Sequence, residues 1–397
     1  MASFGITYLS SDALREARKF MSADQKGVRD EIGFLLIHQK YADRFFPGTS
    51  VLHTRIRYIL FVPWMYHDEY ARPSRRLRVA DSIKAREYTL TGRLLDEPFG
   101  VIGSGKHPDP VEQRPSQVYW TALRKWGILR DHEDLGPFSR GQVERLLSAQ
   151  RTAQLTDDEG ISLAKGEWPF LCDDPPDEWR GNGKLTFRLL PKEKIFLARQ
   201  IRGLKSDGLI GAPSLFAQLV GHDLANVRHA WNIQIQRLAG KERPALVRAG
   251  HVAALAAIGR AIYAAQVETL RARRDRMPTS DRQRKALASV VSQWRDRAAL
   301  LDWDAFSADM KDLPEPVAEA LRSTLQWVRR GSANAMALED AYRAAEQFRK
   351  GRRSRLSLTQ DGVERRMEWD NEAHPKAEPL HYRWDRVKML LADLVGA

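Results

Sequence analysis

The stretch that most constrains the fold is FFPGTSVLHTRIRYILFVPWMY, residues 45–66. Pro47-Gly48 predicts a turn, because proline fixes φ and glycine tolerates a positive φ, and the hydroxyl of Ser50 can cap the free N–H groups that follow. Apolar residues then recur at helical spacing, which predicts a helix that is buried on all sides. Pro63 removes one N–H group and is expected to kink or end this helix.

Two arginines, Arg55 and Arg57, lie inside this apolar segment without a neighbouring acid. Because an unpaired buried charge is costly, they need partners: acids elsewhere in the fold, helix C-terminal carbonyls or phosphate. We expect Arg57 to be the more deeply buried, since large apolar residues follow it at helical spacing. The residues assigned to this structural motif are Pro47, Gly48, Ser50, Arg55, Arg57, Tyr58 and Trp64.

Four stretches together resemble an uncharacterised bacterial family known only as a domain of unknown function. The first is FPGTS-x3-TR-x-RY-x3-VPW within residues 45–66, and residues 100–129, 185–201 and 381–394 follow in order. The resemblance covers essentially the whole chain and implies no established activity or site. It does imply a setting, since members of the family recur in bacterial defence and DNA-modification gene islands beside helicases and nucleases.

The composition favours a basic, globular protein. The chain has 64 Lys and Arg against 51 Asp and Glu, a net charge of +13, which favours polyanionic partners over a merely basic soluble protein. Cys172 is its one cysteine, so neither an intrachain disulfide nor a cysteine-based zinc site can form. We expect a cytoplasmic protein that binds no membrane and no cofactor, since no signal peptide or membrane-length apolar run is found.

Helical periodicity dominates the chain and predicts a mainly α-helical protein with a few short strands. Residues 185–190 alternate apolar and polar side chains, which predicts one such strand. We expect an N-terminal helical domain (1–155), a linker rich in proline and acids (156–184) and a basic C-terminal helical domain (185–397). The expected helices span residues 12–22, 26–45, 52–62, 72–98, 115–126, 191–201, 213–221, 223–239, 244–275, 280–301, 314–330 and 335–350.

The aromatic helix at 115–126 has two interpretations. It resembles one helix of a winged-helix-like unit in the N-terminal half, but any helix packed in a core has the same apolar stripe. The linker acids also have two interpretations. Clustered carboxylates suit a divalent cation, yet acids in a proline-rich loop are more often solvated, and the spacing of a calcium-binding loop is absent.

Positive charge concentrates in the C-terminal half, in two clusters around 271–285 and 349–355. Cations suit the end of the helix before 276, but Arg282 and Arg284 oppose the dipole at the start of the next helix and therefore need another explanation. We predict that both clusters bind nucleic acid. The predicted contact residues are Arg271, Arg273, Arg274, Arg276, Arg282, Arg284, Lys285, Arg349, Lys350, Arg352, Arg353 and Arg355.

Local motifs for catalysis are absent from the sequence. Residues 103–106 are Gly-Ser-Gly-Lys, but they lack the spacing and the following helix of a phosphate-binding loop. A nuclease centre needs two acids and a lysine on adjacent strands, and Glu193-Lys194 lacks a clear partner acid. We therefore favour a non-catalytic DNA-binding or scaffold component of a bacterial anti-phage defence or DNA-modification system, acting beside helicase or nuclease subunits. The alternatives are a divergent metal-dependent nuclease and a protein–protein adaptor.

Overall fold

The protein is mainly α-helical, as the sequence predicts. The structure is a computed structural model and describes residues 30–74, 76–109, 111–132, 136–156 and 168–395. The helix expected at 12–22 lies outside these residues. The chain forms two compact units. Unit 1 combines the described residues up to Gln39 with Arg248–Leu380, and unit 2 combines Lys40–Val247 with the residues from His381 onwards.

The units differ from the predicted domains, because each predicted domain is one continuous segment and each unit is not. Each unit is built from two separate segments of the chain, so the segments 1–155 and 185–397 do not map onto one unit each. Residues 168–184 of the predicted linker lie within unit 2. Packing between distant segments decides this division, and composition along the chain carries no signal for it.

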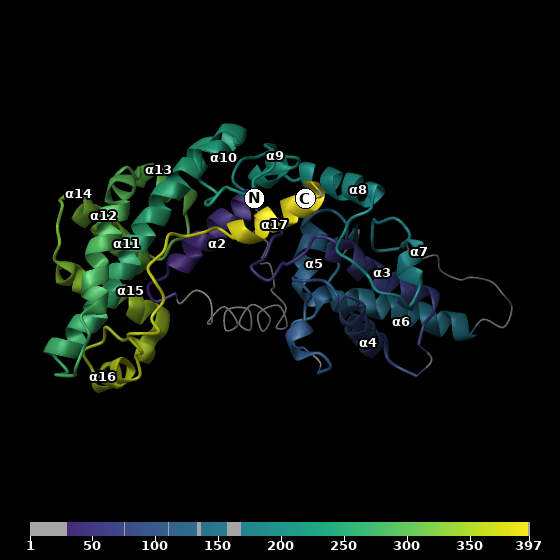
Figure 1. The fold of residues 1–397 in the computed structure, drawn as a ribbon, viewed down its shortest axis with the longest axis horizontal. Helices are drawn as coiled ribbons and strands as arrows, with labels where there is room; N and C mark the ends of the chain where they lie inside the picture. Colours follow the sequence, from purple (N-terminus) through teal and green to yellow (C-terminus); the bar gives the residue numbers. More distant parts are fainter. Residues whose placement is uncertain (1–29, 75, 110, 133–135, 157–167, 396–397) are drawn as a thin grey trace, which may run out of the picture. The chain divides into compact units, whose positions relative to one another are not determined.

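Unit 1 is built around the long helix α11, whose residues are buried almost continuously from Val252 to Leu270. Figure 1 shows α11 alongside α12 and α15, and α14 packs against both α12 and α15. The alanines and Gly259 of α11 allow close helix packing on several sides. The helices of this unit are the first part of α2 (Phe34–Phe45), α11 (Arg243–Arg273) from Arg248 onwards, α12 (Arg282–Ala299), α13 (Trp303–Asp309), α14 (Glu315–Arg329), α15 (Glu339–Lys350) and α16 (Gln360–Met367), with 3-10 turns η4 (Ala335–Leu338) and η5 (Gly351–Arg353).

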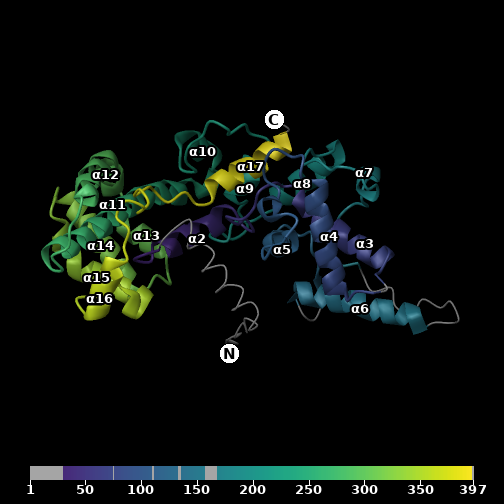
Figure 2. The ribbon, with the colours of Figure 1, turned by 60° about the horizontal axis from the view of Figure 1, so that its bottom comes forward.

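Unit 2 is built around α3, which is buried along its first two turns and packs against α4, α5 and α6. Figure 2 shows α4 lying across α3 and reaching α6. Its helices are the rest of α2, α3 (Tyr58–Ala71), α4 (Val79–Arg93), α5 (Pro115–Lys125), α6 (Arg140–Thr156), α7 (Asp177–Arg180), α8 (Pro191–Arg202), α9 (Leu215–Leu219), α10 (Ile233–Leu238), the start of α11, and α17 (Trp384–Val395), with 3-10 turns η2 (Ser104–Lys106) and η3 (Gly240–Glu242).

Strand structure in the described residues is limited to one short hairpin. β1 (Asp131–His132) pairs antiparallel with β2 (Gly136–Pro137), between α5 and α6. The winged-helix interpretation of this region stays a prediction. The strand predicted at 185–190 does not form, although its alternation is real: Leu185, Phe187 and Leu189 are buried while their neighbours are exposed. The segment is extended, but no neighbouring strand pairs with it among the described residues.

Several predicted helices are wrong in extent; α4, for example, covers only Val79–Arg93 of the predicted 72–98. Residues 50–57 form turns, so the helix of the motif begins only at Tyr58, and it continues through Pro63 to Ala71. The helix predicted at 223–239 is reduced to α10. Short polar side chains bind the backbone locally in its place: Asp223 accepts the N–H of Ala225 at 3.1 Å, and Asn232 accepts that of Gln234 at 3.0 Å.

One helix among the described residues is long and apolar enough to span a membrane by length and composition alone. It is α11 with the preceding 3-10 turn, Gly240–Arg273, and 78% of its apolar window is buried within the protein. A buried core helix of a water-soluble fold has the same composition, so this property by itself carries little weight.

The close approach at Gly259 gives a test of the packing in unit 1. A Cβ atom at this position would lie 2.6 Å from the ring of Phe34 and 3.0 Å from the hydroxyl of Tyr342. We expect Gly259→Val to lower the free energy of unfolding by about 1–3 kcal/mol, because overpacking forces buried neighbours to move. Urea denaturation measures the change. Gly141→Ala in α6, where a Cβ would meet nothing within 4 Å, is the control and should be neutral or stabilising.

Candidate nucleic-acid interface

The first predicted cluster of cations lies at the end of α11 and the start of α12. Arg271 and Arg274 donate to backbone carbonyls of unit 1, those of Trp369 at 2.8 Å and Leu358 at 2.6 Å. Arg282 forms an exposed ion pair with Glu372. The exposed cations of this cluster with no acid at ion-pair distance in the described part of the chain are Arg273, Arg274, Arg276 and Lys285.

A buried acid explains Arg284 at the start of α12. Glu268 of α11 is fully buried, and its carboxylate accepts the backbone N–H groups of Gln283 at 3.3 Å and Arg284 at 2.9 Å. The Arg284 guanidinium lies 3.4 Å from the same carboxylate and also pairs with Asp281. Glu268 therefore supplies the negative charge that this helix start requires, and its cationic neighbours balance it.

Most cations of the second predicted cluster, in residues 349–355, form ion pairs within unit 1. Arg349 pairs with Asp30 at 2.8 Å, and Arg355 pairs with Glu31 at 3.2 Å. Lys350 lies 3.5 Å from Glu31. These acids precede α2, so the cations that look unbalanced in the local sequence are matched by carboxylates more than 300 residues away.

Glu346 of α15 is a further partner in this part of unit 1. It is fully buried and accepts hydrogen bonds from the hydroxyls of Tyr263 at 2.6 Å and Ser354 at 2.7 Å. Burial and the Glu346 carboxylate raise the pKa of Tyr263 well above its ordinary value, so the phenol remains a donor. Arg352 and Arg353, by contrast, are exposed on η5 and have no acid at ion-pair distance among the described residues.

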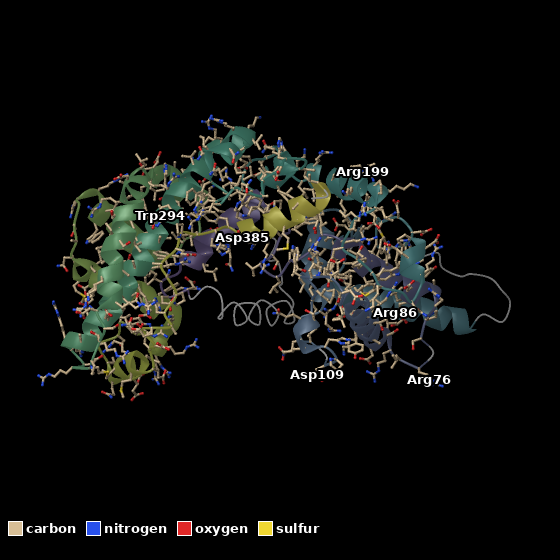
Figure 3. The ribbon with its side chains drawn as sticks, viewed as in Figure 1. Arg76, Arg86, Asp109, Arg199, Trp294 and Asp385 are labelled. Atoms are coloured by element: carbon tan, nitrogen blue, oxygen red, sulfur yellow. The ribbon has the colours of Figure 1, made fainter. Side chains whose placement is uncertain are left out.

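Unit 2 carries a basic surface that the sequence reasoning missed. Residues 188–205 contain six cations and one acid, Glu193. In the described part of the chain none of the six lies at ion-pair distance from an acid, and Arg199 lies at the outer edge of unit 2 in Figure 3. We call this surface the α8 face. Its residues are Arg188, Lys192, Lys194, Arg199, Arg202 and Lys205, all exposed except the half-buried Lys194.

The local sequence explains why α8 presents its cations outward. Pro191 begins the helix, and Glu193 accepts the N–H of Leu190 at 2.9 Å, which caps the first turn. Phe196 and Ile201 lie on the buried side, while Lys192, Arg199 and Arg202 follow each other at spacings of about two turns and one turn on the other side. This spacing was readable in the sequence. The inward orientation of Glu193 was not.

Glu193 is turned inward by Arg57, which is fully buried. The guanidinium of Arg57 binds the Glu193 carboxylate through two hydrogen bonds, Nε to Oε2 at 3.0 Å and Nη2 to Oε1 at 2.8 Å. It also donates to the carbonyl of Thr186 at 2.8 Å and pairs with Glu178. Of the partners considered for this arginine, the structure therefore supplies acids, two of them, and it adds the carbonyl of Thr186, which lies in an extended segment and not at the end of a helix.

The second arginine of the motif is held by α17. Arg55 pairs with Asp393 at 2.7 Å, and the same carboxylate accepts the backbone N–H of Ile56 at 2.8 Å. Burial raises the pKa of Asp393, while the hydrogen bonds from Arg55 and Ile56 oppose this shift. The Arg55 guanidinium also lies 4.9 Å from the ring centroids of Phe99 and Phe187. This side chain therefore has an anionic and an aromatic environment within unit 2.

The turn at the start of the motif is closed by α5. Trp126 donates its indole N–H to the carbonyl of Pro47 at 3.0 Å. Gly48 has φ of 78°, and a Cβ there would lie 2.8 Å from the same indole nitrogen, so glycine is required. Ser50 accepts the N–H of Leu52 at 3.2 Å. The turn is thus fixed both by its own residues and by the end of α5.

Side chains, rather than a helix, satisfy the backbone of residues 49–55. Arg383 donates to the carbonyl of Thr49 at 2.8 Å, and Arg386 donates to that of Val51 at 3.0 Å. The phenol of Tyr119 accepts the N–H of Thr54 at 2.9 Å. These contacts explain why the helix predicted from residue 52 does not begin there.

His53 lies inside this loop and is fully buried. Its ring stacks on Tyr119 with centroids 4.4 Å apart, and its Nε2 lies 3.2 Å from the carbonyl of Val118. Burial, with a smaller contribution from the charges of Arg383 and Arg386 and against the opposing effect of the hydrogen bond, lowers the pKa of His53 to about 3. The neutral ring therefore donates from Nε2.

The alternative sites considered from the sequence are placed as follows. In α5, Val118, Tyr119 and Leu123 are buried, whereas Arg124 and Lys125 are exposed at its end. Glu193, the acid considered for a nuclease centre, binds Arg57. Within the described ranges, no three His, Cys, Asp or Glu side chains come together as a metal site.

Comparison with known proteins finds a family for the part of the chain that includes the motif and the start of α8. Residues 7–196 match the model of a family of unknown function, DUF6361. No curated protein and no solved structure matches the chain. The match agrees with the expected kind of family, one without a known function. The detailed signature and the link to defence stay predictions.

The Arg57 network predicts a strong and local effect on stability. Arg57→Ala should lower the free energy of unfolding by about 3–5 kcal/mol, because it leaves the carboxylate of Glu193 buried without its partner. Chemical denaturation followed by circular dichroism measures the change. Arg72→Ala removes an exposed ion pair with Asp68 and is expected to cost less than about 1 kcal/mol. If Arg57→Ala keeps its stability but loses nucleic-acid binding, the structural role is wrong and Arg57 has a role in binding.

The buried His53 predicts a loss of stability in acid. Between pH 6.5 and about 3 the unfolded chain binds a proton at this ring that the folded chain does not bind, so unfolding is favoured as the pH falls. Denaturation of the wild type and His53→Phe at pH 7.5 and 4.5 tests this. We expect a smaller loss on acidification in the variant, whatever its absolute stability at pH 7.5. Equal losses in both proteins contradict the assignment.

Proposed function

We propose that the protein is a non-catalytic nucleic-acid-binding component, with DNA as the favoured partner, and that the α8 face is its main contact surface. The observation that carries the proposal is the absence of acidic partners for the six cations of this face within the described residues. A cation already paired with a carboxylate has little to gain from a phosphate. An unpaired and exposed cation gains a partner and releases counterions from the nucleic acid.

The dimensions of the α8 face support contact with a phosphate backbone. Lys192 and Arg202 are ten residues apart, which corresponds to about 15 Å along a helix. A DNA strand rises about 3.4 Å per nucleotide, so this distance spans several phosphates. Ile195, between these cations, is 71% exposed and leaves an apolar surface for a base or a sugar. The arrangement favours backbone contacts over sequence-specific base contacts.

Unit 1 supplies a second group of candidate contacts. Of the twelve cations predicted from the sequence, those exposed without an acidic partner in the described residues are Arg273, Arg274, Arg276, Lys285, Arg352 and Arg353. The others bind carboxylates or carbonyls within the unit. Their charges still add to the field around the protein, so the predicted clusters attract polyanions over distances of about a Debye length, ~8–10 Å.

The cellular setting that we propose is a bacterial anti-phage defence or DNA-modification system in the cytoplasm. The support is the resemblance of four stretches of the sequence to a family found beside helicases and nucleases. A protein that holds DNA for such enzymes needs a phosphate-binding surface and a stable scaffold, and it needs no catalytic centre of its own. The buried polar networks of both units provide that stability.

Charge reversal on α8 gives the deciding test. We expect Lys192→Glu/Arg199→Glu/Arg202→Glu to weaken binding to a fluorescent DNA duplex at low salt. The slope of log K against log salt should become shallower by about 0.9 for each phosphate that the variant no longer binds. Fluorescence anisotropy over a salt series, with single-stranded DNA, duplex DNA and RNA as separate probes and with and without magnesium, measures both effects.

The matched control reverses the same number of charges in unit 1. Arg273→Glu/Arg352→Glu/Arg353→Glu changes the net charge equally, so it separates a contact surface from a general loss of positive charge. A larger effect of the control than of the α8 variant would place the main surface in unit 1. Absence of binding by the wild type at low salt would reject nucleic-acid binding and favour the adaptor. Cleavage that requires magnesium would favour the nuclease.

A further inference from the structure

Unit 2 contains a small aromatic cavity that the proposed function does not use. Its volume is about 240 Å³, and it is lined by residues of α3 and of the segment that precedes α7. The residues that matter for its chemistry are Trp64, His67, Tyr70, Trp168, Asp173 and Asp174. The last two belong to the acid-rich segment for which the sequence offered either a metal site or simple solvation.

The aromatic rings that line the cavity come from two segments and are set at large angles to one another. The ring of Trp168 lies 5.5 Å from that of Tyr70 at 48°, and 5.9 Å from that of His67 at 90°. The Trp64 side chain is held in place by two contacts. Its indole N–H donates to the carbonyl of Asp173 at 3.0 Å, and its ring centroid lies 5.4 Å from that of Trp179. The cavity is therefore bounded by rings on more than one side.

The same cavity has a negative rim. Asp173 is exposed and the Asp174 side chain is 83% exposed, and in the described residues neither pairs with a lysine or an arginine. The Nε2 atom of His67 lies 3.9 Å from the carboxylate of Asp174. Burial, together with the charges of both aspartates, raises the pKa of the adjacent Cys172 to about 12. The thiol is therefore neutral at physiological pH, and the carboxylates set the charge at this rim.

We propose that this cavity binds an organic cation of the methylated-ammonium class. The faces of tryptophan and tyrosine rings attract cations through their quadrupole, and enclosure by several rings is the usual way in which proteins bind quaternary ammonium groups. The two aspartates add a Coulomb attraction that a neutral ligand would not experience. The cavity is smaller than the ~300–1,000 Å³ of sites for drug-sized ligands, so it suits a head group rather than a whole cofactor.

Binding of small probes to the full-length protein tests the proposal. We expect tetramethylammonium and choline to bind, as detected by calorimetry and by ligand-observed NMR at constant ionic strength. The neutral isostere of choline, 3,3-dimethylbutan-1-ol, should bind at least about tenfold more weakly, because it lacks the charge that the rings and the carboxylates recognise. A trimethyl-lysine peptide as a further probe distinguishes a free small molecule from a methylated protein as the source of the group.

Matched variants assign the binding to this cavity. Tyr70→Leu and Trp168→Leu should each weaken tetramethylammonium binding by about tenfold. The control Tyr88→Leu removes an equally exposed tyrosine, 44% against 42% for Tyr70, and should leave binding unchanged. Asp173→Asn/Asp174→Asn should also weaken binding, whereas Asp177→Asn removes a nearby charge outside the cavity and should not. Circular dichroism verifies that each variant is folded.

Three results would overturn the proposal. The first is no binding of tetramethylammonium to the wild type at millimolar concentration. The second is equal binding of the cation and its neutral isostere, which would make the cavity merely apolar. The third is a Tyr88→Leu variant that loses as much affinity as Tyr70→Leu, which would place the binding elsewhere. Because no nucleic acid is present in these measurements, their outcome is independent of the α8 charge reversals.

Discussion

The buried guanidinium of Arg57 is the interaction on which the rest of unit 2 depends. A fully buried cation is tolerable only when several acceptors surround it, and here two carboxylates and a carbonyl come from residues 178–193. The interaction joins the start of α3 to the start of α8. It also removes the one acid of residues 188–205 from the surface, so the same pair that stabilises the core leaves the α8 face with an excess of positive charge.

Unit 1 uses the opposite arrangement, in which buried acids organise surface cations. Glu268 and Glu346 are fully buried, and each binds a helix start or a turn together with basic or hydroxyl side chains. Asp275 forms an almost completely buried pair with Arg366. Charge along the sequence is therefore a poor guide to charge on the surface. A row of arginines such as 349–355 loses most of its free charge to acids that are distant in sequence.

The sequence predicted the features that depend on neighbouring residues, such as the helices. It did not predict the features that depend on contacts between distant segments. The helical class and the long helices α11, α12 and α14 followed from periodicity. The alternation of residues 185–190 matches their alternating burial, but the strand predicted from it also needs a partner strand, and the N–H of Leu185 binds the carbonyl of Arg93 instead. For the candidate site, the helical spacing of the cations of α8 can be recognised in the sequence. The excess of positive charge on the α8 face, however, depends on the inward orientation of Glu193, and only the fold determines that orientation.

The contacts between the C-terminal residues and residues 49–56 of the motif limit how the chain can be divided into fragments. Asp393, Arg383 and Arg386 hold residues 49–56, and Glu242 binds Arg44 at 2.8 Å, yet all four lie beyond residue 196, where the match to the family ends. A fragment cut at that boundary would keep the sequence motif and lose the side chains that give it its shape. The part of the chain that matches the family model is shorter than the part whose side chains hold the motif in place.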